Sequence, residues 1–64
     1  MLGVVTAFDD PVGVGIITAD DGAELAFHCT QLVDGTRTIA VGTRVSFERW
    51  PRLGRYEARR IGPA

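Results

Sequence analysis

The stretch Val12–Gly22, VGVGIITADDG, decides the fold of this chain. Apolar residues alternate with small ones over most of its length, which is the period-2 pattern of a half-buried β-strand. Asp21-Gly22 then supplies the positive φ that a tight hairpin turn needs. A second alternating run, ELAFHCT, follows at residues 24–30. The two runs together predict a β-hairpin.

Outward from this hairpin, the same alternation continues and no stretch has the 3.6-residue period of a helix. It predicts strands over residues 2–9, 12–19, 23–29, 43–50 and 55–61. Turns are expected at Asp9-Asp10-Pro11, Asp20-Asp21-Gly22 and Pro51–Gly54, and a long connection runs from Thr30 to Gly42. Because closure removes the exposed edges of a small sheet, this pattern predicts an all-β fold: a five-stranded antiparallel barrel of the OB-fold type.

The alternation also predicts which side chains face the core of the barrel. The inward set is Ile17, Leu25, Phe27, Cys29, Val45 and Phe47. The outward set is Val12, Val14, Ile16, Ala26, His28, Arg44, Ser46, Glu48 and Trp50. Gly13 and Gly15 suit places where neighbouring strands approach closely.

The size and composition of the chain limit what it can contain. Its 64 residues are enough for one domain, spanning residues 1–64. The single cysteine, Cys29, excludes an intrachain disulfide, and no Cys/His cluster has the spacing of zinc ligands. We therefore expect no metal and no other cofactor. The N-terminal residues lack the features of a signal peptide and no apolar run is long enough to span a membrane, so we expect a cytoplasmic domain.

The net charge of −1 conceals a strong asymmetry along the chain. Residues 1–35 carry six carboxylates and no basic residue, a net charge of −6, whereas residues 36–64 carry seven arginines and two glutamates, a net charge of +5. All the basic residues are arginines, which suit phosphate binding and base stacking. Two interpretations stay open: the arginines bind a nucleic acid, or the oppositely charged halves attract one another in the folded chain.

The sequence predicts a binding module rather than an enzyme. His28 and Cys29 are neighbours on a predicted strand, so their side chains should face opposite ways and form no nucleophile–base pair. The chain has no other histidine and no lysine for acid–base chemistry. Asp20, Asp21 and Glu24 indicate a solvated hairpin tip rather than a cation site. Gly13-x-Gly15 lacks the third glycine and the helix of a dinucleotide-binding loop.

A set of residues spread along the chain follows a characteristic order. It comprises Gly3 and Val5, Phe8-Asp9, Gly13-x-Gly15-x-Ile17, Phe27-His28, Asp34-Gly35, Gly42-x-x-Val45-x-Phe47, Gly54 and Glu57-Ala58. In this order and spacing the chain resembles the cold shock domain family from Gly3 to about Ile61. The resemblance implies an OB-fold that binds single-stranded RNA or DNA through two motifs on its second and third strands.

The chain departs from that family where the aromatic rings should be. Its first motif, Val12–Ile17, has lost the lysine and both phenylalanines of the family pattern Lys-Gly-Phe-Gly-Phe-Ile. Its second motif, Leu25–Cys29, keeps only the histidine of the pattern Val-Phe-Val-His-Phe, and Ala7 and Thr36 replace two further aromatic residues. Stacking of a base on a ring contributes roughly 1–3 kcal/mol. We therefore predict nucleic-acid binding that is weakened or shifted in position.

The residues that remain for such binding are one histidine, three aromatic residues and several arginines. The predicted site comprises His28, Phe8, Trp50, Tyr56, Arg37, Arg52, Arg55 and Arg59. His28 stands where the family histidine contacts a base, and Phe8 suits either a matching aromatic position or a partly buried place in the core. Trp50 and Tyr56 with their arginines suit a second platform, or else a cover for one end of the barrel. The predicted function is single-stranded RNA or DNA binding by a protein of cold shock type, as an RNA chaperone or a regulator of transcription or translation.

A second hypothesis is a protein-interaction module built on the same fold. Val12, Val14, Ile16 and Ala26 would form an exposed aliphatic patch, which suits a homodimer or a regulatory protein partner. Salt separates the two hypotheses, because phosphate binding weakens steeply as salt rises whereas aliphatic pairing holds or strengthens.

Overall fold

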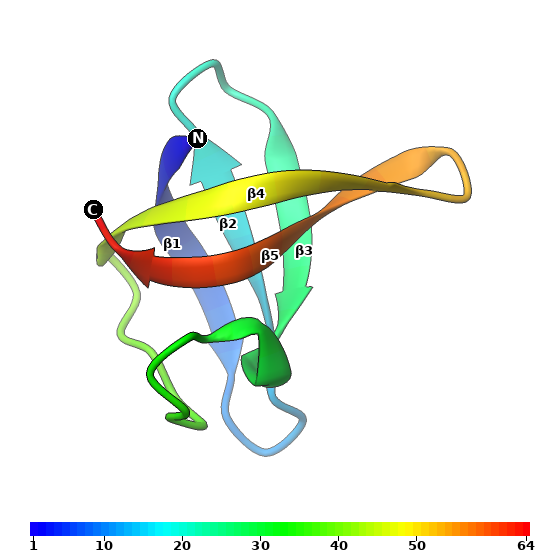
Figure 1. The fold of residues 1–64 in the computed structure, drawn as a ribbon. Helices are drawn as coiled ribbons and strands as arrows, with labels where there is room; N and C mark the ends of the chain where they lie inside the picture. Colours follow the sequence, from blue (N-terminus) through cyan, green and yellow to red (C-terminus); the bar gives the residue numbers. More distant parts are fainter.

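The computed structural model describes all 64 residues and contains five strands (Figure 1). They are β1 (Leu2–Asp9), β2 (Val14–Ala19), β3 (Glu24–His28), β4 (Arg44–Arg52) and β5 (Arg55–Pro63). A short 3₁₀ helix, η1 (Cys29–Gln31), follows β3. The structure has no helix that is long and apolar enough to cross a membrane. The five expected strands are confirmed. The expected turn at Pro51–Gly54 is shorter than predicted, because Pro51 and Arg52 continue β4.

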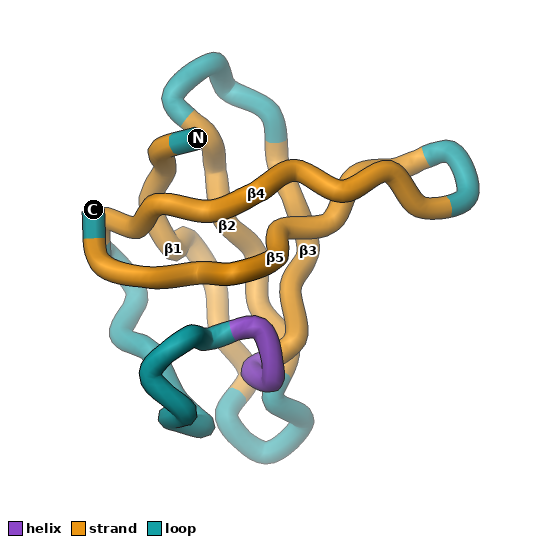
Figure 2. Tube along the Cα trace, viewed as in Figure 1, coloured by secondary structure: helices purple, strands orange, loops and turns teal.

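The strands close into a barrel in the order β1-β2-β3-β5-β4 (Figures 1 and 2). Neighbouring strands are antiparallel except β3 and β5, which run parallel and meet at Ala26 and Glu57. Five strands in a closed ring cannot alternate in direction at every contact, so one parallel contact is unavoidable. The structure therefore confirms the OB-fold barrel and locates its parallel seam between β3 and β5.

Ten apolar residues fill the barrel. They are Val5, Ile17, Ala19, Leu25, Phe27, Leu32, Val45, Phe47, Ala58 and Ile61. The inward positions predicted on β2, β3 and β4 all lie in this set, and Cys29 packs against it, half-buried. Leu32 was not predicted, because it comes from the long connection, where no strand pattern exists to reveal it.

Gly15 lets the rings of Phe8 and Phe27 lie together. A Cβ atom at Gly15 would stand 2.6 Å from the ring of Phe27, a contact that real Cβ atoms do not make. The ring of Phe8, opposite Gly15 in the ladder, stacks on Phe27 with centroids 5.9 Å apart. The predicted close packing at Gly15 is therefore observed, and Phe8 turns its ring toward the core.

Two irregularities change which side chains face outward. In β1, Thr6 is an extra residue between Val5 and Ala7, so Thr6 and Ala7 are both exposed. In β5, the register shifts beside Arg60, whose φ is 52°. As a result Arg59 and Arg60 both point away from the core, while the next residue, Ile61, returns to it.

Candidate nucleic-acid interface

The outer surface of β1, β2 and β3 carries an aliphatic patch with no exposed phenylalanine, tyrosine or tryptophan ring. Ile16 lies between Ala7 on one side and Ala26 on the other, and Val14 lies beside His28. Val14 and Ile16 are 40% and 37% exposed. We call Ala7, Val14, Ile16 and Ala26 the aliphatic face. Val12, predicted to belong to this surface, lies outside β2 in the preceding turn and is more exposed.

His28 ends β3 with its ring held in one orientation. Its Nδ1 atom lies 3.2 Å from the backbone nitrogen of Thr30 and 3.0 Å from the Thr30 hydroxyl. A backbone N–H can only donate, so Nδ1 accepts, and the proton of the neutral ring is on Nε2. The exposed side chain therefore offers an Nε2–H donor to a ligand.

The expectation that His28 and Cys29 point apart was wrong. The alternation of side chains ends with β3 at His28, and Cys29 begins η1. The Cys29 sulfur consequently lies 3.9 Å from His28 Nδ1. That nitrogen already accepts the Thr30 N–H, so its lone pair is engaged and does not activate the thiol.

The hairpin formed by β4 and β5 extends beyond the barrel wall (Figure 1) and has two different surfaces. On one surface the Arg59 guanidinium lies 4.6 Å from the centre of the Trp50 ring. On the other surface Arg49 lies 5.0 Å from the centre of the Tyr56 ring. Residues adjacent in a strand face opposite sides, and Trp50 is opposite Glu57 whereas Tyr56 is opposite Pro51. Trp50 and Tyr56 thus do not form one platform.

A groove of about 370 Å³ runs along the contact of β3 with β5 and is lined by residues that are distant in sequence. We call it the β3–β5 groove; it is lined by Val14, Ala26, Phe27, His28, Gln31, Arg52, Glu57 and Ala58. It brings His28 and Arg52, both predicted site residues, to one place together with half of the aliphatic face. Gln31 and Glu57 were not predicted, because only closure of the barrel brings η1 and β5 to this position.

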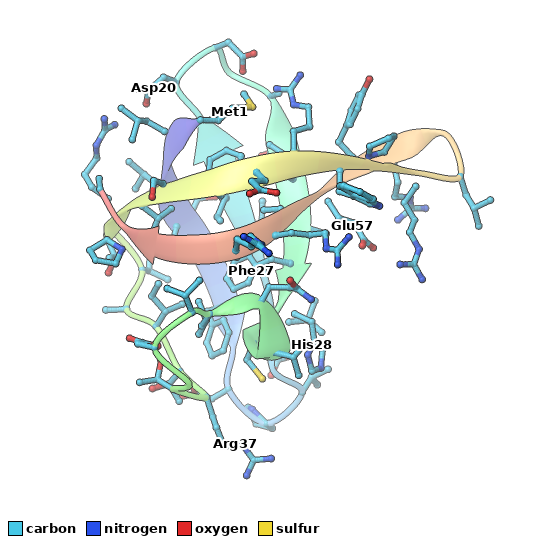
Figure 3. The ribbon with its side chains drawn as sticks, in the orientation of Figure 1. Met1, Asp20, Phe27, His28, Arg37 and Glu57 are labelled. Carbon is cyan, nitrogen blue, oxygen red and sulfur yellow. The ribbon has the colours of Figure 1, made fainter.

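A second hollow lies on the other side of His28. We call it the Arg37 hollow; it is lined by Asp10, Pro11, Val12, Gly13, His28, Cys29, Arg37 and Thr38. His28 and Arg37 are labelled in Figure 3, at the end of the barrel opposite Asp20. His28 therefore lies between Arg37 of the long loop and Arg52 of the hairpin.

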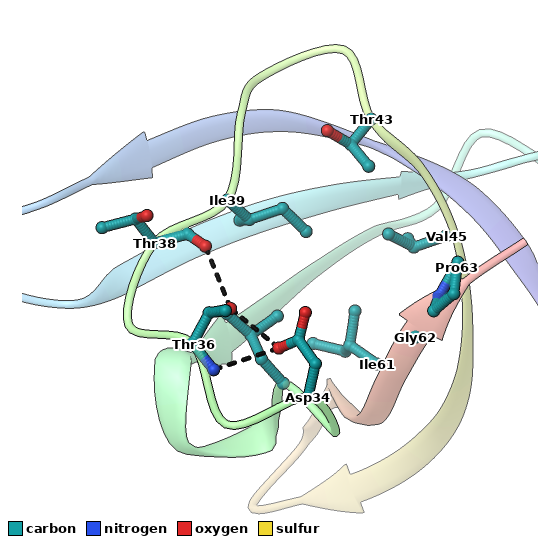
Figure 4. A pocket seen from close by; sticks show the side chains of 10 residues that line it. Asp34, Thr36, Thr38, Ile39, Thr43, Val45, Ile61, Gly62 and Pro63 are labelled. Atoms are coloured by element: carbon teal, nitrogen blue, oxygen red, sulfur yellow. Dashed lines mark hydrogen bonds between the residues drawn. The ribbon is translucent and has the colours of Figure 1, made fainter.

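The loop that carries Arg37 is fixed by Asp34 (Figure 4). The Asp34 carboxylate accepts hydrogen bonds from the Thr36 backbone N–H at 3.0 Å and from the Thr36 hydroxyl at 2.8 Å. These two bonds, the backbone bond first, lower the pKa of Asp34. The cavity beside them is lined by the loop and by barrel residues such as Val45 and Ile61, so it is the covered end of the barrel.

The acidic turn between β2 and β3 neutralises two of the arginines. Asp20 lies 2.8 Å from Arg44 and Asp21 lies 3.3 Å from Arg49. The Ala23 backbone N–H, with a smaller contribution from Arg49, lowers the pKa of Asp21. The attraction between oppositely charged halves is therefore present at this turn. Arg37, Arg55 and Arg59 form no ion pair in the structure, and Arg52 has only a 3.8 Å contact with Glu57.

The predicted residues thus fall into four groups. His28, Arg37 and Arg52 line two adjoining hollows, and Trp50, Arg55 and Arg59 share the outer surface of the neighbouring hairpin. Tyr56 lies on the opposite surface of the hairpin, where Arg49 covers its ring. Phe8 is half-buried, and its ring stacks on Phe27 and packs against the core.

Comparison with known proteins agrees with this geometry. A family model described as the 'Cold-shock' DNA-binding domain matches residues 1–63. No curated protein matches the chain. The family match supports a general nucleic-acid-binding role, and the family is not typically enzymatic. The chain belongs to the cold-shock DNA-binding domain family.

Proposed function

We propose that the chain binds single-stranded RNA or DNA along a path from Arg37, over His28, to Arg52. The observation that carries the proposal is that His28 lines both the Arg37 hollow and the β3–β5 groove. A strand crossing His28 would therefore have an arginine at either side. Guanidinium groups bind phosphate oxygens in a fork, and His28 Nε2–H donates to a base or a phosphate.

Trp50 supplies a stacking surface at the end of this path. It lies opposite Glu57, which lines the β3–β5 groove, and its side chain is 47% exposed. Arg59 lies over one face of the ring, so a base stacks on Trp50 by the other face. A base stacked on an aromatic ring contributes roughly 1–3 kcal/mol.

The proposed binding is weak and tolerant of sequence. The aliphatic face contacts a base without stacking under it, and the acidic residues of the first 35 positions repel phosphates. The arginines of the path suit contacts with phosphates, which carry no sequence information. Brief occupation of many sequences suits an RNA chaperone better than a sequence-specific regulator.

The test is fluorescence anisotropy of labelled oligo-dT and oligo-U at low and moderate salt, with Trp50 fluorescence followed in the same titration. Arg52→Gln should weaken binding and lower the slope of log affinity against log salt by about 0.7, the value of one phosphate contact on a single strand. Arg44→Gln is the matched control, because Arg44 pairs with Asp20 away from the path. It should leave the slope unchanged.

Two results would contradict the proposal. If Arg52→Gln and Arg44→Gln have the same slope as the original chain, the path does not include Arg52. If neither oligonucleotide changes anisotropy or Trp50 fluorescence, single-stranded binding is excluded. Sedimentation of the chain at high salt would then test self-association through Val14 and Ile16.

A further inference from the structure

The tip of the β4–β5 hairpin is held in a conformation that disfavours its own residue. Leu53 and Gly54 form the two-residue turn, with φ angles of 45° and 83°. Positive φ at both positions is usual for a tight hairpin, but asparagine, aspartate or glycine normally occupies the first one. Leucine is disfavoured there because its Cβ crowds the backbone.

The same leucine contacts nothing in the folded chain. Its side chain is 99% exposed, the largest value among the large apolar residues. A strained backbone and a fully exposed leucine are both unfavourable in water, and no contact within the chain offsets them. Outliers of this kind point to a role in binding.

The charges beside Leu53 indicate the partner. Arg52 and Arg55 are directly opposite one another at the close of the turn, where like charges repel. Residues 49–60 carry five arginines and one glutamate. A polyanion removes the repulsion between Arg52 and Arg55, whereas a neutral or basic partner does not.

Leu53 narrows the choice among polyanions. Phosphate groups alone offer no apolar surface, but the face of a base does, and apolar side chains are used as wedges against stacked bases. Arg52 lies at the tip and also lines the β3–β5 groove, so the proposed single-stranded path leads to Leu53. A terminal base pair next to a single strand presents both kinds of surface together.

We propose that the hairpin tip binds the junction between a duplex and a single strand, with Leu53 against the last base pair and Arg52 and Arg55 at the phosphates of the two separating strands. This inference rests on the proposed function, since the single-stranded arm occupies the β3–β5 groove. The inference gives Leu53, which lies outside the aromatic motifs, a role in binding. The substrate class is a junction rather than a uniform single strand.

The experiment compares two probes and two variants. One probe is a DNA stem-loop with a single-stranded dT tail and 2-aminopurine in the base pair next to the tail; the other is oligo-dT of the same tail length. Leu53→Asn removes the apolar wedge and keeps a residue suited to positive φ, so the hairpin should still form. Leu53→Met is the control, because it keeps an apolar side chain of similar size.

The original chain should bind the junction more tightly than oligo-dT and raise the 2-aminopurine fluorescence. Leu53→Asn should lose affinity for the junction by about tenfold and leave oligo-dT binding within about twofold, and Leu53→Met should retain both signals. Equal affinity of the original chain for both probes, or equal losses in the two variants, would overturn the inference and leave the proposed function standing. Failure of the original chain to bind oligo-dT would overturn both.

Discussion

Gly15 is the residue on which the stacking of Phe8 on Phe27 depends. Its missing side chain leaves room for Phe27, whose ring in turn supports Phe8. The backbone oxygen of Ala7 is equally close to the position that a Cβ would take, at 2.6 Å. Neither β1 nor the Phe27 ring can move away without disturbing the buried residues around them.

Gly15→Ala should therefore destabilise the fold by about 1–3 kcal/mol, the usual effect of overpacking a core. Urea unfolding followed by Trp50 fluorescence measures the change. Gly22→Ala is a useful comparison, because Gly22 has a φ of 92° but nothing within 4 Å, so only backbone strain opposes the substitution. A loss at Gly15 no greater than that at Gly22 would show that Phe27 moves aside easily.

A substitution at Leu53 should stabilise the fold, in contrast to Gly15→Ala. Because leucine is disfavoured at positive φ, Leu53→Asn should stabilise the free protein by about 1 kcal/mol. For a domain of this size that corresponds to a rise in Tm of about 4–8 °C. Thermal unfolding by circular dichroism is sufficient to check it. An unchanged or lower Tm would mean that the turn imposes no penalty on leucine.

Among the elements, the strands were predicted well and the contacts between them were not. The alternation of Ile17, Leu25 and Phe27 with outward residues is a local property, so the sequence reveals it. The extra residue Thr6 breaks that alternation within β1, and no local pattern marks such an insertion. The β3–β5 groove was also beyond prediction, because its walls are joined only by closure of the barrel.

β2 offers a gain-of-function test of the weakened site. Val14→Phe and Ile16→Phe would restore rings to the aliphatic face, beside His28 and Ala26 respectively. Each ring should tighten oligo-dT binding by about fivefold or more, which is the lower limit for stacking one base. Val41→Phe, at an exposed loop position, should have no effect. No gain from either β2 variant would show that the strand passes elsewhere.

The long loop gives a pH-dependent prediction through Asp34. Hydrogen bonds from Thr36 lower the pKa of Asp34 in the folded state below the ordinary value of about 4, so the charged carboxylate stabilises the fold above that pH. The contribution is lost as the pH falls through the lowered pKa. The urea midpoint of Asp34→Asn should lie below that of the original chain at pH 7, and the two should converge at acid pH. Asp10→Asn, which removes no hydrogen bond, should show no such convergence.

For the molecule as a whole, charge separates into two regions. The acidic turn at Asp20 and Asp21 holds Arg44 and Arg49, while the arginines of the hairpin tip and of the long loop stay available. The exposed ion pairs at the turn contribute little to stability, about 0–1 kcal/mol each. Their larger effect is on orientation: they neutralise the arginines near the acidic turn, so a phosphate chain is attracted to the arginines of the hairpin tip and the long loop instead.

The parallel seam has a mechanical consequence. Between β3 and β5 the wall is joined only at Ala26 and Glu57, and the next backbone link to β5 comes from Leu32, beyond η1. We therefore expect this seam to open more easily than the other contacts of the barrel wall. A nucleic acid lying in the β3–β5 groove would contact both β3 and β5 and keep the two strands together. Amide hydrogen exchange near Ala26 and Glu57 would then slow more on binding than exchange in the β1–β2 ladder, so that the ligand reinforces the barrel at its weakest contact.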